Sequence, residues 1–293
     1  MSRTFNLTRT CIAVGFVAVA GLAAHAQQTV YAIGNGGTSL VRFQSNNPAG
    51  ATVVANFSGG TQFLDAIDFR PATGQLYGYS DATDSFYTVN ITNGTTTLAS
   101  VGASGAPTNT FQLGMDFNPT IDRARVVTDS GQNIVFNPVA GTAAAFTTLA
   151  YGTGDANENA SPSIIDNAYT QSFAGAATTQ QYAIDYGVDA LVRLDNNAGT
   201  LTTVGALGVN TDIYTGFDIA TIGGVDSAYA ILTGANGTPS FYTINLSTGS
   251  ATLVGAMGVT NQVYSLAVVP APTTAAAVCL CLAIPGTRRR NRS

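Results

Sequence analysis

The sequence predicts an all-β protein, a five-bladed β-propeller, and three observations lead to this prediction. The composition favours strands and tight turns: of 293 residues 45% are apolar and 9% charged, with 32 glycines, no lysine and Glu158 as the single glutamate. A five-residue turn motif recurs along the chain. The first repeat also lacks an opening strand, and the last repeat is followed by an additional one.

The turn motif is Asn or Asp, three residues, then Gly, and it occurs five times: 46–50, 90–94, 137–141, 195–199 and 245–249. The first side chain can accept a hydrogen bond from the turn backbone, and the glycine can adopt a positive φ. An alternating apolar strand precedes each turn, and a Thr- and Ala-rich strand follows it. The glycines are 44, 47, 58 and 50 residues apart, which is typical of four-stranded propeller blades.

Two further strands are predicted before each of the last four turns. They are 64–69 with 75–79, 113–117 with 123–127, 169–173 with 181–184, and 214–219 with 228–231. The first repeat begins directly at its second strand, 29–33, and an unmatched strand stands at 263–268. We therefore expect strand 263–268 to pair with the N-terminal blade and close the ring, which removes exposed sheet edges. A β-sandwich is the alternative, but the matching ends favour the propeller.

The N-terminal residues 1–26 have the pattern of a secretory signal peptide. Arg3 and Arg9 precede an apolar run, 11–24, and Ala24-His25-Ala26 forms a cleavage site for signal peptidase. The alternative is a membrane anchor, for which this run is short. The mature chain is expected to begin at Gln27.

The C-terminal residues 270–293 resemble the PEP-CTERM sorting tail of bacterial exported proteins. A proline-containing segment, 269–274, leads into an apolar run, 275–284, followed by four arginines: Arg288, Arg289, Arg290 and Arg292. Ala271 stands where the family has glutamate, and the apolar run is shorter than a membrane span. The resemblance implies transient retention at the inner membrane and removal by an exosortase-type protease. The alternative is a frayed, weakly hydrophobic tail.

The propeller domain, 27–269, has few residues that support catalysis. The only histidine and all three cysteines lie in the two terminal segments, so the body has no His, Cys, Lys or Trp. This excludes Ser-His and Cys-His catalysis, Schiff-base chemistry, disulfides and the usual zinc sites. All 16 carboxylates lie in the body with only five arginines, which gives it a formal charge of −11. Such a charge argues against nucleic-acid binding.

Three aspartates occupy the same place in the predicted opening strands: Asp68, Asp116 and Asp218. Ser172 and Ala267 are expected at this place in the other two blades. Opening strands line the central channel of a propeller, so these carboxylates are candidate ligand-binding residues and, as a less favoured alternative, glycosidase acids. A structural contact repeated from blade to blade is the simplest interpretation.

Arg123 and Arg125 interrupt the repeat pattern and point to the same face of one strand. We expect them to form ion pairs with Asp116, Asp122 or Asp129. The functional alternative is a clamp for an anion or carboxylate, because paired guanidinium groups bind such ligands well.

The longest interruption of the repeat, 152–166, contains oxygen-rich residues: Asp155, Asn157, Glu158 and Asn159. Calcium prefers such oxygen ligands, although the segment lacks the complete EF-hand pattern. A solvated loop is the simpler interpretation, and Ca²⁺ at this loop is the only cofactor that we consider.

Three stretches are specific enough to compare with known families: 68–77, 114–127 and 128–133, together with 241–245. They resemble the bacterial DUF4394 family, a repeat domain of unassigned activity, over nearly all of 29–269. The resemblance implies a repeat architecture and an extracytoplasmic location, and it brings no catalytic residues.

These observations favour an exported, non-enzymatic surface or matrix protein, whose rigid propeller binds a surface protein or glycan that the sequence does not identify. One alternative is a module that binds glycans or small anions at the channel mouth. The other is a carboxylate-dependent glycoside hydrolase.

Overall fold

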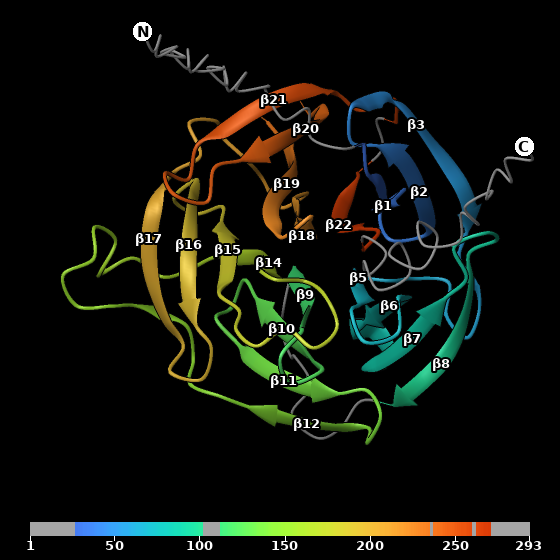
Figure 1. Ribbon diagram of the computed structural model, residues 1–293, viewed down its shortest axis with the longest axis horizontal. Coiled ribbons are helices and arrows are strands. Elements are labelled where there is room, and N and C mark those ends of the chain that lie inside the picture. The colour runs from blue at the N-terminus through green and yellow to red at the C-terminus, as the bar shows by residue number, and fades with distance from the viewer. Residues whose placement is uncertain (1–26, 102–111, 235–236, 260–261, 271–293) are drawn as a thin grey trace, which may run out of the picture.

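The computed structural model describes residues 27–101, 112–234, 237–259 and 262–270, which form a five-bladed β-propeller. Figure 1 shows the five sheets arranged around a central axis, in chain order around the ring. Within these ranges the helical structure is one 3-10 turn, Asp81–Thr83. No helix among the described residues is long and apolar enough to cross a membrane. The predicted all-β propeller is confirmed.

Each blade is an antiparallel sheet whose innermost strand lies next to the central axis. Blade 1 contains, from the axis outward, β22 (Tyr264–Val268), β1 (Thr29–Gly34), β2 (Ser39–Gln44) and β3 (Asn47–Asn56). Blade 2 contains β5 (Ala66–Arg70), β6 (Gln75–Ser80), β7 (Ser85–Val89) and β8 (Thr95–Val101). The short β4 (Ser58–Gly59) adds to the outside of blade 2 in parallel with β8.

The remaining blades follow the same order. Blade 3 contains β9 (Leu113–Asn118), β10 (Arg123–Thr128), β11 (Asn133–Asn137) and β12 (Thr142–Ala145). Blade 4 contains β14 (Ile164–Tyr169), β15 (Gln181–Asp185), β16 (Ala190–Asp195) and β17 (Thr200–Ala206), with β13 (Ala150–Tyr151) outside. Blade 5 contains β18 (Gly216–Ile222), β19 (Val225–Thr233), β20 (Pro239–Ile244) and β21 (Ala251–Ala256).

The innermost strand of blade 1 comes from the C-terminal end of the described chain. β22 pairs antiparallel with β1, with Val268 opposite Val30 and Ala267 opposite Tyr31. Blade 1 therefore joins two segments more than 200 residues apart, and the loss of either segment would leave β-sheet hydrogen-bonding groups unpaired.

Two sequence-based assignments are wrong. The innermost strand of blade 4 is β14, which ends at Tyr169, whereas we expected a strand at 169–173. Ser172 consequently lies in the loop between β14 and β15. The first predicted turn, 46–50, also differs, because β2 and β3 meet in a tighter hairpin in which Gln44 faces Asn47. Because β3 begins at Asn47, the remaining residues of the motif lie within this strand.

The other four turns form as predicted. In each, the backbone N–H of the glycine donates to the carbonyl of the first Asn or Asp, and the glycine has a positive φ. The side chains of Asn90, Asn137 and Asn245 also accept hydrogen bonds from backbone N–H groups two residues later. These turns connect the third and fourth strands of their blades.

The hydrophobic core is divided into five clusters, one at each junction between neighbouring blades. At the junction of blades 2 and 3, for example, Phe86 stacks on Phe136 with ring centroids 3.7 Å apart. At the junction of blades 5 and 1, Phe43 packs edge-on against Phe241. Each blade thus buries both faces of its sheet, which explains why its inner strands are almost uniformly apolar.

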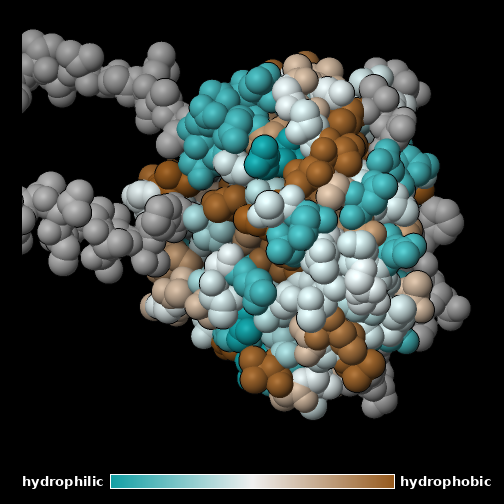
Figure 2. Space-filling view, turned by 90° about the vertical axis from the view of Figure 1, so that its right-hand side faces the viewer, coloured by the Kyte–Doolittle hydropathy of each residue, from teal (hydrophilic) through white to brown (hydrophobic). Residues whose placement is uncertain are grey.

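The outer strands face solvent and are less apolar. Figure 2 shows one side of the molecule, where hydrophobic residues form separate patches among polar ones. On β3 and β8, the exposed aliphatic residues include Val53, Leu98 and Val101. Scattered apolar residues of this kind are ordinary on protein surfaces.

Candidate functional site

The three predicted channel aspartates lie at equivalent positions of three innermost strands. Their partners in the second strands are in the same register: Asp68 faces Tyr77, Asp116 faces Arg125 and Asp218 faces Tyr229. In blade 1 this position is Ala267, opposite Tyr31, as expected. In blade 4 it is Ala168, opposite Tyr182, and not Ser172.

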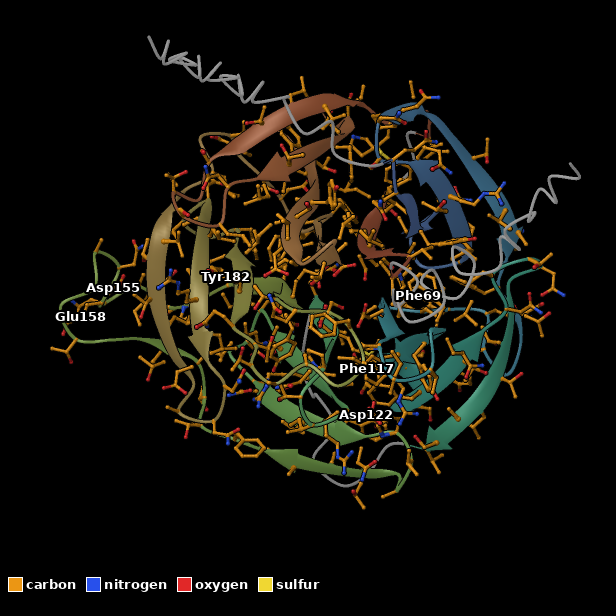
Figure 3. All side chains as sticks on the ribbon, in the orientation of Figure 1. Phe69, Phe117, Asp122, Asp155, Glu158 and Tyr182 are labelled. Carbon is orange, nitrogen blue, oxygen red and sulfur yellow. The ribbon has the colours of Figure 1, made fainter. Side chains whose placement is uncertain are left out.

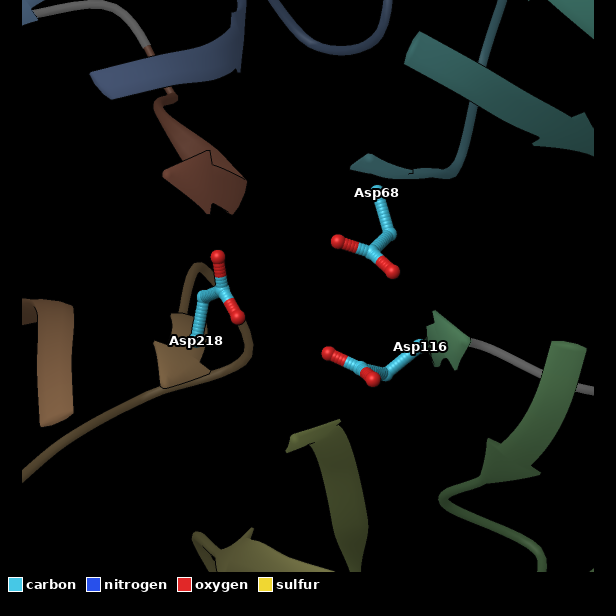
Figure 4. A group of neighbouring side chains, drawn as sticks. All are labelled: Asp68, Asp116 and Asp218. Atoms are coloured by element: carbon cyan, nitrogen blue, oxygen red, sulfur yellow. The ribbon is translucent and has the colours of Figure 1, made fainter. Parts of the chain in front are cut away.

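The three carboxylates converge near the axis of the propeller. One oxygen from each of Asp68, Asp116 and Asp218 lies within 4.8 Å of the others. Figure 4 shows the three side chains extending from different blades toward a common centre. The residues are only 3–4% exposed. We refer to Asp68, Asp116 and Asp218 as the channel triad.

Each member of the channel triad also connects its own blade to the next. Asp68 accepts a hydrogen bond from the backbone N–H of Phe117 in blade 3, at 2.8 Å. Asp116 accepts from the N–H of Tyr169 in blade 4. Asp218 accepts from the N–H of Val268 in blade 1, at 2.6 Å.

Two residues that the sequence did not single out complete this ring of contacts. In blade 4, Asp166 accepts from the N–H of Phe217 in blade 5, at 2.8 Å. In blade 1, the Ser265 hydroxyl accepts from the N–H of Ile67 in blade 2, at 3.0 Å. Both lie two residues before the triad position of their blade. They nevertheless make the same kind of contact, accepting a backbone N–H of the next blade. We call these five acceptors (Asp68, Asp116, Asp166, Asp218 and Ser265) the acceptor ring.

Burial controls the electrostatics of the acceptor ring. Desolvation raises the pKa of Asp68, Asp116 and Asp166 well above the ordinary value, and the neighbouring carboxylates raise it further. Burial also raises the pKa of Asp218, to about 7, although backbone N–H donors partly oppose this shift. The ring therefore concentrates carboxyl groups that resist ionisation in the absence of a cation.

One oxygen in the channel triad has no hydrogen-bond partner. Both oxygens of Asp218 accept backbone N–H groups, from Ile219 and Val268. Asp68 accepts from the N–H groups of Phe69 and Phe117. In contrast, Oδ1 of Asp116 is buried and unpartnered. A buried acceptor without a donor is energetically costly, so this oxygen is a candidate ligand atom.

The arginines differ from the expected ion-pair network. Arg125 is buried and donates to the Tyr169 hydroxyl at 2.9 Å, to Oδ1 of Asn133 and to the Asn196 carbonyl, thereby joining blades 3 and 4. Arg123 donates to two carbonyls of its own turn, those of residues 121 and 122. The hydrogen bonds of Arg123 and Arg125 described here go to carbonyls, a hydroxyl and an asparagine side chain, while the charge of Arg123 also helps to lower the pKa of Asp122, one of the expected partners.

The partner of Asp122 is a different arginine, Arg70, with which it forms an ion pair across blades 2 and 3. This pairing lowers the pKa of Asp122. Hydrogen bonds to polar neighbours occupy the guanidinium of Arg125, and its own turn occupies that of Arg123. Neither arrangement resembles an open anion clamp.

The predicted calcium loop lies at the periphery, where Figure 3 shows Asp155 and Glu158 far from the axis. Asp155 binds the outer strand β17, accepting hydrogen bonds from both the N–H and the hydroxyl of Thr203. Glu158 accepts from the N–H of Gly154. Asn157 donates through its amide nitrogen to Thr203, and Asn159 is exposed. Asp155 is thus tied to β17, whereas Glu158 is exposed and accepts one backbone N–H; calcium binding at this loop stays a prediction.

A polar pocket of about 530 Å³ lies at the junction of blades 5 and 1. Asn35, Asp212, Tyr214 and Gln262 contribute to its lining. Gln262 donates to the Tyr214 hydroxyl at 2.6 Å, and burial raises the pKa of Asp212. Asn35, Asp212 and Gln262 lie outside the predicted strands, and Tyr214 was expected only as the first residue of strand 214–219, so the repeat pattern did not reveal the pocket.

Comparisons with known proteins place the chain in a family but identify no activity. A search of curated proteins gives no match. Among solved structures, a chain in a "Crystal structure of Nidogen/Laminin Complex" is similar, with 8% identity and a TM-score of 0.48. The match covers 83% of this chain and 98% of that one. The family model DUF4394, described as a domain of unknown function, matches residues 39–267. The chain therefore belongs to the DUF4394 family.

Proposed function

We propose that this chain is an exported, non-enzymatic binding protein whose propeller is a rigid recognition scaffold. The observation that supports this function best is the burial of the candidate acids. Asp68, Asp116 and Asp218 are 3–4% exposed, and each holds a backbone N–H of the next blade. A glycosidase acid has to reach the bond that it protonates, which these carboxyl groups do not do for a polymeric substrate.

The binding surface in this proposal is the end of the propeller at which the innermost strands begin. In an antiparallel blade, the connections entering the first strand and those between the second and third strands lie at the same end. We call this end the acidic face. Its carboxylates that are not fully buried are Asp65, Asp81, Asp84, Asp129, Asp189 and Asp212, with Asp155 and Glu158 in the connection that enters β14.

The arginines of the body lie elsewhere. Arg42, Arg125 and Arg193 are within strands, and Arg70 and Arg123 flank hairpins at the opposite end. This separation of charge favours a basic or cationic partner at the acidic face and disfavours small anions.

The polar pocket supports a second candidate, the binding of a neutral glycan. It lies on the acidic face and combines a tyrosine ring with the amides of Asn35 and Gln262 and the carboxyl group of Asp212. Such groups match the hydroxyls and apolar ring face of a sugar. Its volume falls within the usual range for small-ligand sites.

Export is tested by expressing the full-length chain in a Gram-negative host and sequencing the N-terminus of the accumulated protein. Cleavage between Ala26 and Gln27 in an extracytoplasmic fraction is the expected result. An uncleaved chain confined to the cytosol would refute export.

Binding is tested by measuring affinity for a basic protein, such as lysozyme, and for a panel of neutral polysaccharides. Substituting Asp84→Asn and Asp189→Asn together should weaken binding of the basic protein, and Tyr214→Ala should weaken glycan binding. Asp195→Asn is the matched control, because this exposed aspartate lies at the opposite end. Equal affinities in all variants, or hydrolysis of a polysaccharide, would contradict the proposal.

A further inference from the structure

We propose that the channel triad binds one divalent cation, with Ca²⁺ as the best-matched ion. The arrangement needed for such a site is present in the described residues. Asp68, Asp116 and Asp218 each offer a carboxylate oxygen, and these oxygens lie within 4.8 Å of one another. Calcium binds oxygen ligands at 2.3–2.6 Å, so two ligands on opposite sides of the ion are about 4.6–5.2 Å apart. The observed spacing fits a shared ion at the centre.

The unpartnered Oδ1 of Asp116 is a second observation that indicates a ligand. Asp116 is 3% exposed and extends toward the other two carboxylates. The carboxylates of Asp68 and Asp218 accept backbone N–H groups, so they are held in position before an ion binds. A carboxylate oxygen retains a second lone pair after accepting one hydrogen bond, and can therefore also coordinate a metal.

Among the described residues, no basic side chain is one of the groups that shift the pKa values of the triad. The groups that interact electrostatically with the triad are the carboxyl of Asp166 and the hydroxyls of Tyr169 and Tyr229. Arg125, which faces Asp116 in the sheet register, donates to Tyr169 and to asparagines of blades 3 and 4. Without a cation the triad holds protons, and Asp116 and Asp218 share a side-chain hydrogen bond; a bound cation would replace these protons and compensate the carboxylate charge.

One residue of the acceptor ring joins two blades but does not belong to the proposed cation site. Asp166 belongs to the acceptor ring and is as buried as the triad, and its two oxygens accept backbone N–H groups, from Asn167 and Phe217, as those of Asp218 do. It is not part of the metal-compatible group. Asp166 thus provides a matched control that has the structural role without the proposed binding role.

The test uses the protein expressed from its full-length sequence, treated with EDTA and then exchanged into metal-free buffer. Calcium chloride is titrated by calorimetry, and bound metal is quantified by atomic emission. We expect one Ca²⁺ per chain. We also expect the melting temperature to rise by about 5–10 °C at a hundredfold excess over the dissociation constant. Asp116→Asn and Asp68→Asn should each weaken binding at least tenfold, whereas Asp166→Asn should bind as the wild type does.

Several results would overturn the proposal. One is the absence of calcium binding by the folded wild type, and another is unchanged affinity in both folded triad variants. Loss of binding in folded Asp166→Asn would place the effect in the acceptor ring as a whole. Loss in Glu158→Gln alone would place the ion in the peripheral loop. Circular dichroism and the melting temperature in EDTA establish that each variant is folded. The result does not depend on the partner proposed for the acidic face, since calcium alone is the probe.

Discussion

The acceptor ring and the peripheral loops use the same residue types for different purposes. At the axis, Asp166 and Ser265 accept backbone N–H groups of the next blade. In the loops, Asp65 accepts from the N–H of Asp81, and Asp155 binds Thr203, so each contact stays within one blade. The contacts of the acceptor ring therefore specify how blades meet, whereas these two loop contacts shape the connections of a single blade. Substitutions that separate the two groups test this difference.

The largest effect is expected at Arg125, which joins blades 3 and 4. Arg125→Ala removes several buried hydrogen bonds, including those to Tyr169 and Asn196, and leaves their acceptors without donors. We expect the free energy of unfolding to fall by about 3 kcal/mol or more, as measured by urea denaturation. Arg123→Ala is the control, because Arg123 contacts only its own turn among the hydrogen bonds described, and should cost less than about 1 kcal/mol. Similar losses in the two variants would contradict the comparison.

A smaller loss is expected when a methyl group is added between inner strands. A Cβ at Gly114 on β9 would lie 2.4 Å from Cα of Asp166 on β14, and a backbone atom has little room to move. Gly114→Ala should therefore cost about 2–3 kcal/mol in thermal or urea unfolding. On the outer strand β21, a Cβ at Gly255 would meet only a ring carbon of Pro48, at 3.2 Å. Gly255→Ala should change stability by less than about 1 kcal/mol; a larger cost there would show that the outer strands are equally constrained.

Ser265 is the only non-ionisable member of the acceptor ring, so its substitution tests the stabilising role of the ring without a change in charge. Ser265→Ala removes the hydroxyl that accepts the N–H of Ile67, and that N–H then remains buried without a partner. The expected cost is about 1–3 kcal/mol, measured in EDTA so that no metal contributes. Ser247→Ala in an exposed turn should lie within about 0.5 kcal/mol of the wild type. A neutral Ser265→Ala would argue against the ring as a stabilising feature.

The effect at Asp65 is no larger than that at Ser265, and it appears as a pH dependence. Burial raises the pKa of Asp65 to about 6, from an ordinary value of 3.8. The folded state therefore holds more protons than the unfolded state between about pH 4 and pH 6, and this carboxyl group makes stability decrease as pH rises through that window. Asp65→Asn keeps an acceptor for the N–H of Asp81 and should remove this contribution, about 1–3 kcal/mol. Melting temperatures of both proteins from pH 4 to pH 7 provide the measurement, and parallel curves would refute the assignment.

Most of the architecture was predictable because it follows from local patterns. The turn motif, the alternation of apolar residues and the unmatched strand at 263–268 depend on neighbours in sequence, and they led to the correct number of blades. The alignment of the fourth blade failed for a physical reason. Its acceptor, Asp166, stands two residues away from the position used in blades 2, 3 and 5, so the repeated aspartate gave no guide to β14.

The sequence by itself determined that the chain forms strands, that it has five repeats, and that its body contains carboxylates without His, Cys or Lys. Only the tertiary structure decided what those carboxylates contact. Asp68, Asp116 and Asp218 are about 50 to 150 residues apart, and ring closure is what brings their oxygens within 4.8 Å of one another. Likewise, Asp122 forms its ion pair with Arg70, 52 residues away in sequence, because adjacent blades place these side chains together. Local backbone preferences are encoded along the chain, whereas the burial and charge environment of a side chain depends on residues that only folding makes its neighbours.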